Sequence, residues 1–491
     1  MMTSEFGTIA DYLNAFEDGV TTAEDVVQRA FSHLESSDKD LGAWISLNQE
    51  QALEEAASID RRRSAGEPVG VLAGVPIGLK DMICTRGLRT TAGSKMLADF
   101  IPPYDATVTS KLREADAVII GKLNQDEYGF GSSNESSFFG PCRNPYDLAR
   151  VAGGSSGGSA AAIAAGHCPV SLGTDTGGSI RQPASLCGVF GIKPTYGRVS
   201  RYGVVSFASS LDQVGPLGRT VADAARVLDV ISGYDANDST SLDVDVPDFQ
   251  AALTRGLDGL RIGIPKEYFQ EGLEPTVETS VRKALSILEA HGATLVPLSL
   301  PHTQYAVATY YVLATAEASS NLGRYDGVRY GHRTKQAVSS LDELITRSRS
   351  EGFGDEVKRR IILGTYVLSS GYYDAYYLKA QKVRTLIKRD FDHAFTHCDL
   401  IAAPTSPVTA FPLGDHVDDP LTMYLMDILT IPASLAGLPC ASQPCGFDAD
   451  GLPIGLQWIA PSLHEDRIFQ AAQAFEDLTT HHRELPTRGK R

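Results

Sequence analysis

Short apolar runs that alternate with helical segments constrain the fold of this 491-residue chain more than any other feature. Three of these runs, bounded by Gly, Asp or Asn, occupy residues 70–83, 115–124 and 168–179. Runs of this length and punctuation are typical of buried strands. Residues 106–116 carry apolar side chains at helical spacing instead. This alternation predicts an α/β layered architecture with a largely buried sheet.

The beginning of the chain follows a different pattern. Thr22 precedes Glu24 and Asp25, and apolar residues then recur at helical spacing, which predicts a helix over about residues 23–35. A second helical segment covers residues 48–66 and ends at a glycine. We therefore expect residues 1–65 to form an N-terminal helical preface packed on the core.

The remainder, residues 66–491, is expected to form a single domain, because strand signals recur near the C-terminus as well as after the preface. It contains a glycine- and serine-rich core over about residues 70–220 and a helical, aromatic region over about 306–395. The acidic, polar stretch 232–250 between them is typical of a long surface connection.

The charge balance and the cysteines exclude several classes of function. The chain has 44 basic and 60 acidic residues, and the resulting net charge of −16 opposes nucleic-acid binding by the chain as a whole. The seven scattered cysteines form no CxxC pair, which indicates reduced thiols rather than disulfides or a zinc site. No apolar run reaches the roughly 18 residues of a membrane span. We expect a cytoplasmic protein with no metal site and no membrane association.

The stretch VAGGSSGGSAAAIAAG at residues 151–166 admits several interpretations. A Walker-type phosphate loop is disfavoured because no lysine follows the glycines, and GxGxxG is absent. A flexible linker is typical of Gly-Ser composition, although strong helix formers follow at once. The elbow pattern GxSxG fits around Ser155 and Ser156, but the preceding residues are polar and broken by Pro145, and His167 is the only histidine nearby.

A fourth interpretation combines serine with lysine. Ser179 follows a predicted strand and the turn Thr176-Gly177-Gly178, whose successive amides can converge on one oxygen as an oxyanion hole does. Lys80 lies in an apolar run, where burial would lower its pKa enough for it to act as a base. A solvent-facing lysine at a strand end accounts for the same pattern, and these residues alone do not decide between the two.

Longer motifs resemble a known family. The runs GVPIGLKD, LNQDEYGFGSSNESSFFGPCRNPYD, GGSSGGSAAAIAAG and GTDTGGSIRQPASLCGVFGIKPTYGRVSRYG resemble the amidase signature family. The resemblance implies an α/β fold with a large mixed β-sheet covered by helices on both faces. It also implies a Ser-Ser-Lys triad, in which a neutral lysine draws a proton through one serine from the nucleophilic serine. These roles fall on Lys80, Ser155 and Ser179, with the oxyanion hole at Thr176, Gly177 and Gly178.

Within this family, TYGRVSRYGVVSFASSLDQVGPLGR, EASSNLGRYDGVRYG and LTIPASLAGLPCASQPCGF resemble the glutamine-hydrolysing members of the aspartyl/glutamyl-tRNA amidotransferases. The resemblance implies a heterotrimer with B and C subunits. The chain itself would bind no cofactor, and ATP and Mg would be used in the partner that amidates mischarged tRNA. That tRNA, Glu-tRNA(Gln), Asp-tRNA(Asn) or both, would be held mainly by the B subunit.

A glutamine pocket needs a cation for the α-carboxylate and an anion for the α-ammonium. The resemblance places these groups at Arg359 and Asp427, with Tyr310 as a further pocket residue in the helical region. Arg360 is adjacent to Arg359 and Tyr311 to Tyr310, so either residue of each pair could fill the role. The alternative function is that of a stand-alone amidase of the same family that acts on another small amide.

Overall fold

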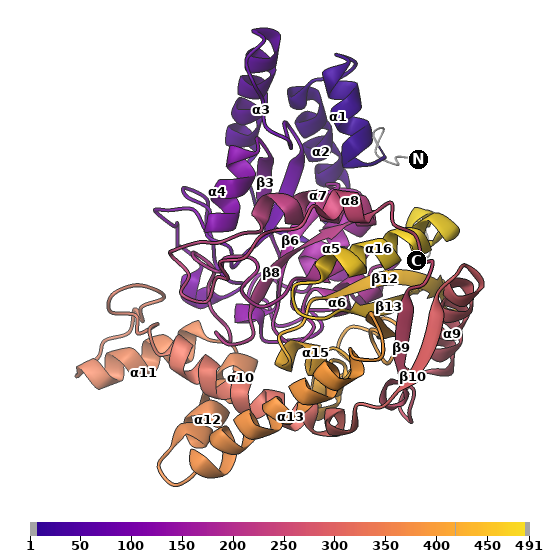
Figure 1. Ribbon diagram of the computed structural model, residues 1–491. Helices are drawn as coiled ribbons and strands as arrows, with labels where there is room; N and C mark the ends of the chain where they lie inside the picture. The colour runs from indigo at the N-terminus through magenta and orange to yellow at the C-terminus, as the bar shows by residue number, and fades with distance from the viewer. Residues whose placement is uncertain (1–6, 418, 487–491) are drawn as a thin grey trace.

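The computed structural model describes residues 7–417 and 419–486, and its centre is one sheet of 11 strands (Figure 1). The order across the sheet is β1-β3-β2-β6-β8-β7-β12-β13-β11-β9-β10. These strands are β1 (Trp44–Leu47), β2 (Pro76–Lys80), β3 (Val118–Leu123), β6 (Val170–Asp175), β7 (Phe190–Lys193), β8 (Gln213–Gly218), β9 (Arg261–Pro265), β10 (Thr294–Leu298), β11 (Leu400–Pro404), β12 (Cys440–Phe447) and β13 (Pro453–Ile459). A separate hairpin consists of β4 (Arg143–Asn144) and β5 (Asp147–Val151).

The sheet is mixed, because β2 pairs in parallel with both β3 and β6, whereas β6 pairs antiparallel with β8. The expected strands within residues 70–83, 115–124 and 168–179 are present as β2, β3 and β6, and every residue of these three strands is buried. Such uniform burial is typical of strands covered on both sides.

Helices surround the sheet, as Figure 1 shows. They are α1 (Ile9–Glu17), α2 (Ala23–Ser37), α3 (Gln49–Ser64), α4 (Thr107–Glu114), α5 (Gly157–Ala164), α6 (Arg181–Leu186), α7 (Val221–Ile231), α8 (Phe249–Ala252), α9 (Pro275–Ala290), α10 (Ala306–Leu322), α11 (Leu341–Gly352), α12 (Asp355–Leu368), α13 (Lys379–Ala394), α14 (Pro420–Leu425), α15 (Ile431–Leu435) and α16 (Glu465–Leu478). A π-helical segment, Asp374–Leu378, precedes α13. No helix within the described ranges is both long and apolar enough to cross a membrane.

Two neighbouring residues of β13 demonstrate that both faces of the sheet are covered. Successive side chains of a strand point to opposite faces. Gln457 accepts a hydrogen bond from Arg181 of α6. The next residue, Trp458, donates to Gln443, whose amide donates to the carbonyl oxygen of Ala472 in α16. Helices α6 and α16 therefore lie on opposite faces, and the expected α/β fold with a large mixed sheet is confirmed.

The preface contains the expected helices and one strand that was not predicted. Thr22 caps α2 by accepting a hydrogen bond from the backbone N–H of Asp25. Between α2 and α3, however, β1 pairs antiparallel with β3 at the edge of the sheet. Trp44 of β1 covers Gly78 and Gly121, which have no side chains that would block the indole. The preface is thus part of the sheet rather than purely helical, and the division into preface and single domain stays a prediction.

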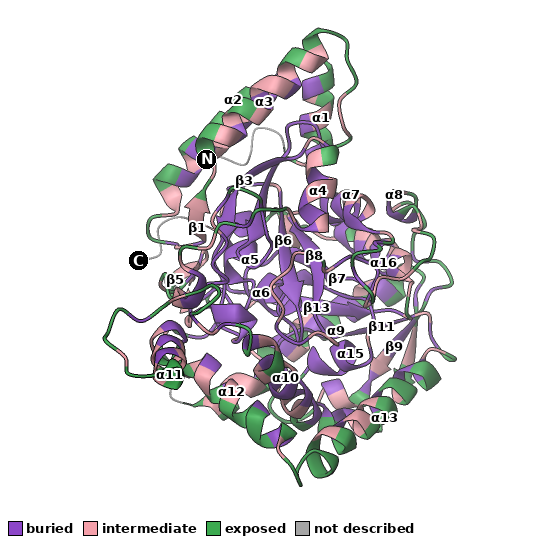
Figure 2. Cartoon of the chain, turned by 90° about the vertical axis from the view of Figure 1, so that its left-hand side faces the viewer, coloured by how far each residue is buried: buried purple, intermediate pink, exposed green. Residues whose placement is uncertain are grey.

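A second core joins the helical layer to the sheet. Helix α10 packs against α12 and α13, and the apolar side chains between them are continuous with the loop after β3. Figure 2 shows the buried centre of the sheet with α5 and α6, while α11, α12 and α13 are exposed along their outer sides. This layer brings the region 306–395 over the ends of β2 and β6.

All seven cysteines are buried and unpaired with each other. Cys440 and Cys445 lie in β12, which pairs with β13. Both thiols are therefore buried within a pair of strands.

Candidate active site

Lys80 is the last residue of β2, and its side chain is fully buried. Its Nζ lies 2.7 Å from Ser155 Oγ, 2.8 Å from Ser156 Oγ and 2.8 Å from Thr174 Oγ1. The backbone carbonyl oxygen of Thr174 lies 3.4 Å away. The structure therefore brings Lys80 and Ser155 together, although they are separated by 75 positions in the chain.

Burial lowers the pKa of Lys80 to about 7, and the carboxylates of Asp126, Asp175 and Asp212 oppose this shift. Desolvation disfavours the charged ammonium, so the neutral amine is accessible near neutral pH. A lysine of this kind can accept a proton, which an ordinary exposed lysine with a pKa near 10.4 does not do at pH 7.

Of the three hydroxyl groups around Lys80, two donate their protons to acceptors other than the lysine. Ser156 Oγ donates to the carbonyl oxygen of Thr174 at 3.0 Å, and Thr174 Oγ1 donates to Met82 Sδ at 3.1 Å. Both hydroxyls can therefore only accept from the lysine. A neutral amine has two N–H donors and one lone pair, so the lone pair is left for Ser155. Ser156 also directly precedes helix α5 as its N-cap residue.

Ser179 lies on the turn that connects β6 to α6, and 7% of its surface is exposed. The backbone N–H of Ser156 donates to the carbonyl oxygen of Ser179 at 3.1 Å, which holds the two glycine- and serine-rich turns together. Ser179 Oγ makes no hydrogen bond in the part of the chain that the structure describes. Its hydroxyl is thus available to a substrate.

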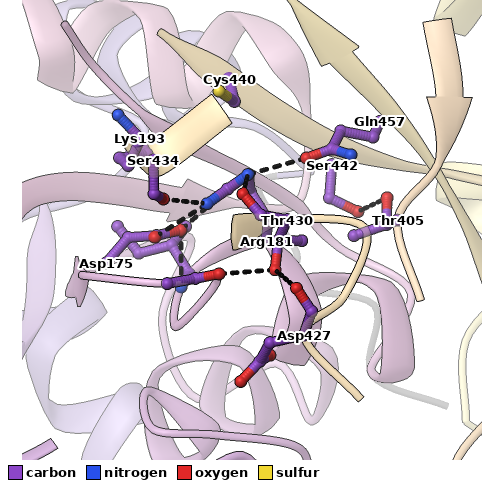
Figure 3. A network of polar contacts seen from close by, with 12 residues as sticks. Asp175, Arg181, Lys193, Thr405, Asp427, Thr430, Ser434, Cys440, Ser442 and Gln457 are labelled. Atoms are coloured by element: carbon purple, nitrogen blue, oxygen red, sulfur yellow. Dashed lines mark hydrogen bonds and ion pairs between the residues drawn. The ribbon is translucent and has the colours of Figure 1, made fainter. Parts of the chain in front are cut away.

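A buried ion pair fixes this turn, as Figure 3 shows. Arg181 contacts both carboxylate oxygens of Asp175 at 2.9 and 3.0 Å. Burial alone would raise the pKa of Asp175, but the charge and hydrogen bonds of Arg181, together with Lys193 and the N–H of Ile180, lower that pKa. Arg181 also donates to the carbonyl oxygen of Thr430 and to the hydroxyl of Ser434. The turn is therefore anchored to the segment that leads into α15.

Two glycines of the turn have pocket residues packed directly on them. A Cβ at Gly177 would lie 2.7 Å from Cζ of Tyr310. A Cβ at Gly178, whose φ is +151°, would lie 2.2 Å from Thr430 Oγ1 and 3.1 Å from Asp427 Oδ1. The N–H groups of Gly177, Gly178 and Ser179 have no partner among the described residues. Successive free amides of this kind can bind an oxyanion.

Asp427 is buried, and one of its carboxylate oxygens has no partner. Ser132 Oγ donates to Oδ2, whereas no described group donates to the buried Oδ1. Burial raises the pKa of Asp427 to about 7, and the hydrogen bond from Ser132 and the charges of Arg181 and Arg360 oppose this rise. An unpaired buried carboxylate oxygen is costly unless a ligand completes it.

The two arginines of the EVKRR segment differ sharply. The Arg359 side chain is 44% exposed and forms an ion pair with Glu356, so the structure does not bring it to the site. The Arg360 side chain is 4% exposed, and its guanidinium carbon lies 5.3 Å from the ring centre of Phe130 and 5.4 Å from that of Tyr311. Arg360 Nε donates to Glu356, and its terminal nitrogens have no hydrogen-bond partner among the described residues. The buried cation beside Asp427 is therefore Arg360.

Comparisons with known proteins agree with this geometry. The amidase family profile matches residues 25–469.

The chain belongs to the amidase signature family.

Curated relatives carry a more specific name. The chain is 56% identical over 481 residues to the A subunit of the glutamyl-tRNA(Gln) amidotransferase of Moorella thermoacetica, and the match covers 98% of each chain. It is 55% identical over 479 residues to the protein of the same name from Geobacillus thermodenitrificans, again with 98% of each chain covered. A solved structure, that of the glutamyl-tRNA(Gln) amidotransferase A subunit from Thermotoga maritima, is 43% identical with a TM-score of 0.80, and 97% of this chain and 96% of that one are covered.

Another solved amidase shares the fold at lower identity. The native peptide amidase from Stenotrophomonas maltophilia is 32% identical with a TM-score of 0.82 over 97% of each chain. The expected amidase signature fold is thereby confirmed. No group of three or more His, Cys, Asp or Glu side chains suited to a metal occurs in the described part of this chain.

The sequence interpretation missed several members of the site. Thr174 and Arg181 hold the lysine and the turn, and Asp126 packs beneath the Gly154–Ser155 peptide, where a Cβ at Gly154 would lie 2.0 Å from its Oδ2. Asp175 and Arg181 flank the turn in the sequence DTGGSIR. Two opposite charges on either side of two glycines are a signal that could have predicted their ion pair.

Proposed function

We propose that this chain is the glutamine-hydrolysing component of a tRNA-dependent amidotransferase, with Lys80, Ser155 and Ser179 as its catalytic residues. The observation that carries the proposal is the contact between the buried Lys80 Nζ and Ser155 Oγ at 2.7 Å. This contact lies beneath a turn with unpaired amides. The names of the curated relatives support the proposal and favour Glu-tRNA(Gln) as the acceptor.

The proposed proton path runs from Ser179 through Ser155 to Lys80. The lone pair of neutral Lys80 takes the Ser155 proton while Ser155 Oγ takes the proton of Ser179 Oγ. The Ser179 oxygen then attacks the side-chain carbonyl carbon of glutamine. The protonated lysine returns a proton, through Ser155, to the leaving nitrogen, the C–N bond breaks and ammonia departs. Water, activated in the same way, releases glutamate from the acyl-enzyme.

The amides of the turn are proposed to hold the oxyanion of both tetrahedral intermediates. Each donor of such a hole typically contributes about 3 kcal/mol to the transition state. The candidates are Thr176, Gly177, Gly178 and Ser179. Asp175 and Arg181 would keep these amides pointing at one place without contacting the substrate themselves.

We assign the two charged ends of glutamine to Arg360 and Asp427. The free nitrogens of Arg360 would bind the α-carboxylate, and the unpaired Oδ1 of Asp427 would accept from the α-ammonium. Tyr310 packs on Gly177 and would form the wall between them. Arg360 replaces Arg359 in this assignment because Arg359 lies on the exposed side of α12.

The partners belong to the same proposal. B and C subunits would complete a cytoplasmic heterotrimer, and ATP and Mg would act in the partner that amidates the tRNA-bound glutamate or aspartate. The net charge of −16 supports a division of labour in which the partner holds most of the tRNA. The ammonia would pass to it within the assembly.

Copurification of the chain with its partner subunits, followed by a glutamine-dependent transamidation assay, tests the function. We expect weak glutaminase activity from the chain alone and a marked increase with partners, ATP and mischarged tRNA. The Ser179→Ala chain should assemble equally well but show no transamidation with glutamine, while added ammonia should restore it.

The competing assignment is a stand-alone amidase. It would gain support, and our proposal would fall, if the purified chain hydrolysed an uncharged amide at full rate and did not respond to partners. The unpaired Oδ1 of Asp427 disfavours this alternative, because a buried polar atom without a partner is costly and an uncharged amide brings no ammonium group to satisfy it.

A further inference from the structure

Glu127 is a buried carboxylate that the proposed proton path does not use. The residue is only 3% exposed. Its Oε2 accepts a hydrogen bond from the backbone N–H of Gly354 at 2.9 Å, and its Oε1 accepts from Ser94 Oγ. Gly354 is the residue that caps the N-terminus of α12. A Cβ at Gly354 would lie 2.4 Å from Glu127 Oε2, so the carboxylate sits directly on the start of the helix.

A carboxylate at this place acts on the whole helix. The first amides of a helix lack partners within it, and negative charge near them is stabilising. Gly354 has no side chain with which to cap α12, so Glu127 supplies the cap from another part of the chain. The position of α12 is thereby tied to the loop that follows β3.

The residues on either side of Glu127 contact the catalytic groups. The backbone N–H of Asp126 donates to the carbonyl oxygen of Ser155 at 3.3 Å. Phe130 lies beneath the guanidinium of Arg360 at 5.3 Å. Residues 126–130 therefore contact the bridging serine, the start of α12 and the cation of the pocket within five consecutive positions.

Helix α12 carries Arg360 on its buried side. Arg360 lies six positions after Gly354, which is roughly 9 Å along the axis at 1.5 Å per residue. Gly364, one turn further, packs so closely on α10 that a Cβ there would lie 1.9 Å from the carbonyl oxygen of Thr315. Glu127 at one end and this contact at the other fix the helix along its length.

We propose that Glu127 is a positioning residue that sets Arg360 for the substrate carboxylate through the N-terminus of α12, and so makes the enzyme selective for amides that carry a carboxylate. This inference rests on the proposed function, in which Arg360 binds the α-carboxylate of glutamine. Among the described residues Glu127 makes no hydrogen bond to Ser155 or Ser179, and the proposal gives it no contact with the substrate.

The test compares two substrates in the complete complex. One is glutamine, and the other is propionamide, a primary amide without a carboxylate. For Glu127→Ala we expect KM for glutamine to rise about tenfold with little change in kcat, because the hydrogen bond from Gly354 is lost at the start of a helix that is proposed to hold substrate. The kcat/KM for propionamide should stay within about twofold of the wild-type value.

Two further variants keep the proposal testable if Glu127→Ala does not fold. Glu127→Gln retains an oxygen that can accept from Gly354, so its KM for glutamine should stay within about threefold of wild type. Ser94→Ala removes the donor to the other carboxylate oxygen and should raise that KM by an intermediate factor. Equal effects of these changes on both substrates, or none on glutamine, would overturn the proposal.

Glu476 offers a matched control. It is also a buried glutamate, and its Oε2 accepts from the backbone N–H of Val221 at the start of α7, a helix that carries none of the site residues. Glu476→Ala should lower the melting temperature but leave the ratio of the two kcat/KM values unchanged. If wild-type enzyme hydrolyses propionamide but not glutamine, the proposed function fails instead, and that outcome is distinct from a change of ratio in the variants.

Discussion

At Lys80, hydroxyl groups rather than carboxylates surround the amine. In the described chain its Nζ contacts only Ser155, Ser156 and Thr174. A carboxylate in direct contact would favour the ammonium form and raise the pKa. Three hydroxyls and one carbonyl oxygen leave burial as the dominant influence, so the neutral base exists near pH 7.

The pH dependence of hydrolysis should report this lysine. Lys80 must be neutral to accept the proton, and its pKa is about 7. On propionamide, which engages neither Arg360 nor Asp427 by charge, kcat/KM should therefore fall tenfold per pH unit below about 7 and level off above it. Steady-state rates from about pH 5.5 to 9 measure this. A profile that is flat between about pH 6 and 8 would exclude Lys80 as the base.

The adjacent arginines provide a matched pair of variants. Arg360→Gln removes the buried cation and should raise KM for glutamine about 30-fold or more, the usual effect of truncating one partner of a buried charge pair. Arg359→Gln removes an exposed ion pair and should change KM by less than about twofold. Initial-rate measurements over a range of glutamine concentrations decide between them. A larger rise in KM for Arg359→Gln than for Arg360→Gln would show that Arg359, not Arg360, binds the carboxylate.

The helical spacing of residues in α12 favours Arg360 over Arg359, although the family resemblance pointed to Arg359. The buried residues of α12 are Val357, Arg360, Gly364 and Val367, spaced three and four apart along one helical stripe. Helical periodicity therefore points to position 360. The resemblance of local motifs to a family predicted that Lys80 and Ser155 lie together near the turn of Ser179, and the structure brings Lys80 and Ser155 into contact. The contacts of Asp126 and Glu127, in contrast, depend on packing between distant segments.

At the scale of elements, the connection from β6 to α6 combines a sharp turn with close packing. Its glycines are required for two separate reasons, since Gly178 has a positive φ and Thr430 leaves no space for a Cβ. The buried pair of Asp175 and Arg181 holds the two ends of this connection. The precision of the site thus comes from the turn and its anchor rather than from the serine alone.

Gly178→Ala should reduce glutaminase activity about 100-fold or more, because the Cβ displaces Thr430 and the amides lose their common direction. Gly451→Ala is its control, since Gly451 also has a positive φ of +82° but has nothing within 4 Å. That variant should lose about 1–2 kcal/mol of stability and retain its activity. Rates and urea unfolding of the two proteins measure both effects. Equal activity losses would argue against the packing explanation.

Strand β1 marks the limit of sequence interpretation for elements. It has only four residues, and its burial does not alternate clearly along the strand. Its place is decided by β3 and by the two glycines that Trp44 covers, which are distant in the sequence at positions 78 and 121. The longer strands and the helices with caps were predictable because length, periodicity and capping residues lie within each segment.

At the scale of the molecule, the sheet joins the two ends of the chain. The preface supplies β1 at one edge, while the last two strands, β12 and β13, lie between β7 and β11 in the interior of the sheet. Ion pairs such as that of Arg113 with Glu55, at 2.6 Å, further tie the preface to the core. The sheet can therefore be completed only after the C-terminal strands are available.

Deletion of residues 1–65 should make the protein aggregate. It uncovers the edge of β3 and the apolar faces that α2 and α3 cover, and an open hydrophobic edge pairs with other chains. Size-exclusion chromatography and the soluble fraction after expression measure this. Leu47→Ser, a change at a side chain 38% exposed on the same strand, should leave the protein monodisperse. A soluble, active deletion variant would contradict the structural role of the preface.

The backbone hydrogen bond from Ser156 to Ser179 has an evolutionary consequence. Because main-chain atoms form this link between the two turns, the link itself does not involve the side chains that are proposed to bind the substrate. We therefore expect that substitutions on α12 or at position 427 can alter the preferred amide while the backbone link between Ser156 and Ser179 is kept. One ancestral scaffold can in this way give rise to enzymes with different substrates through a small number of pocket mutations.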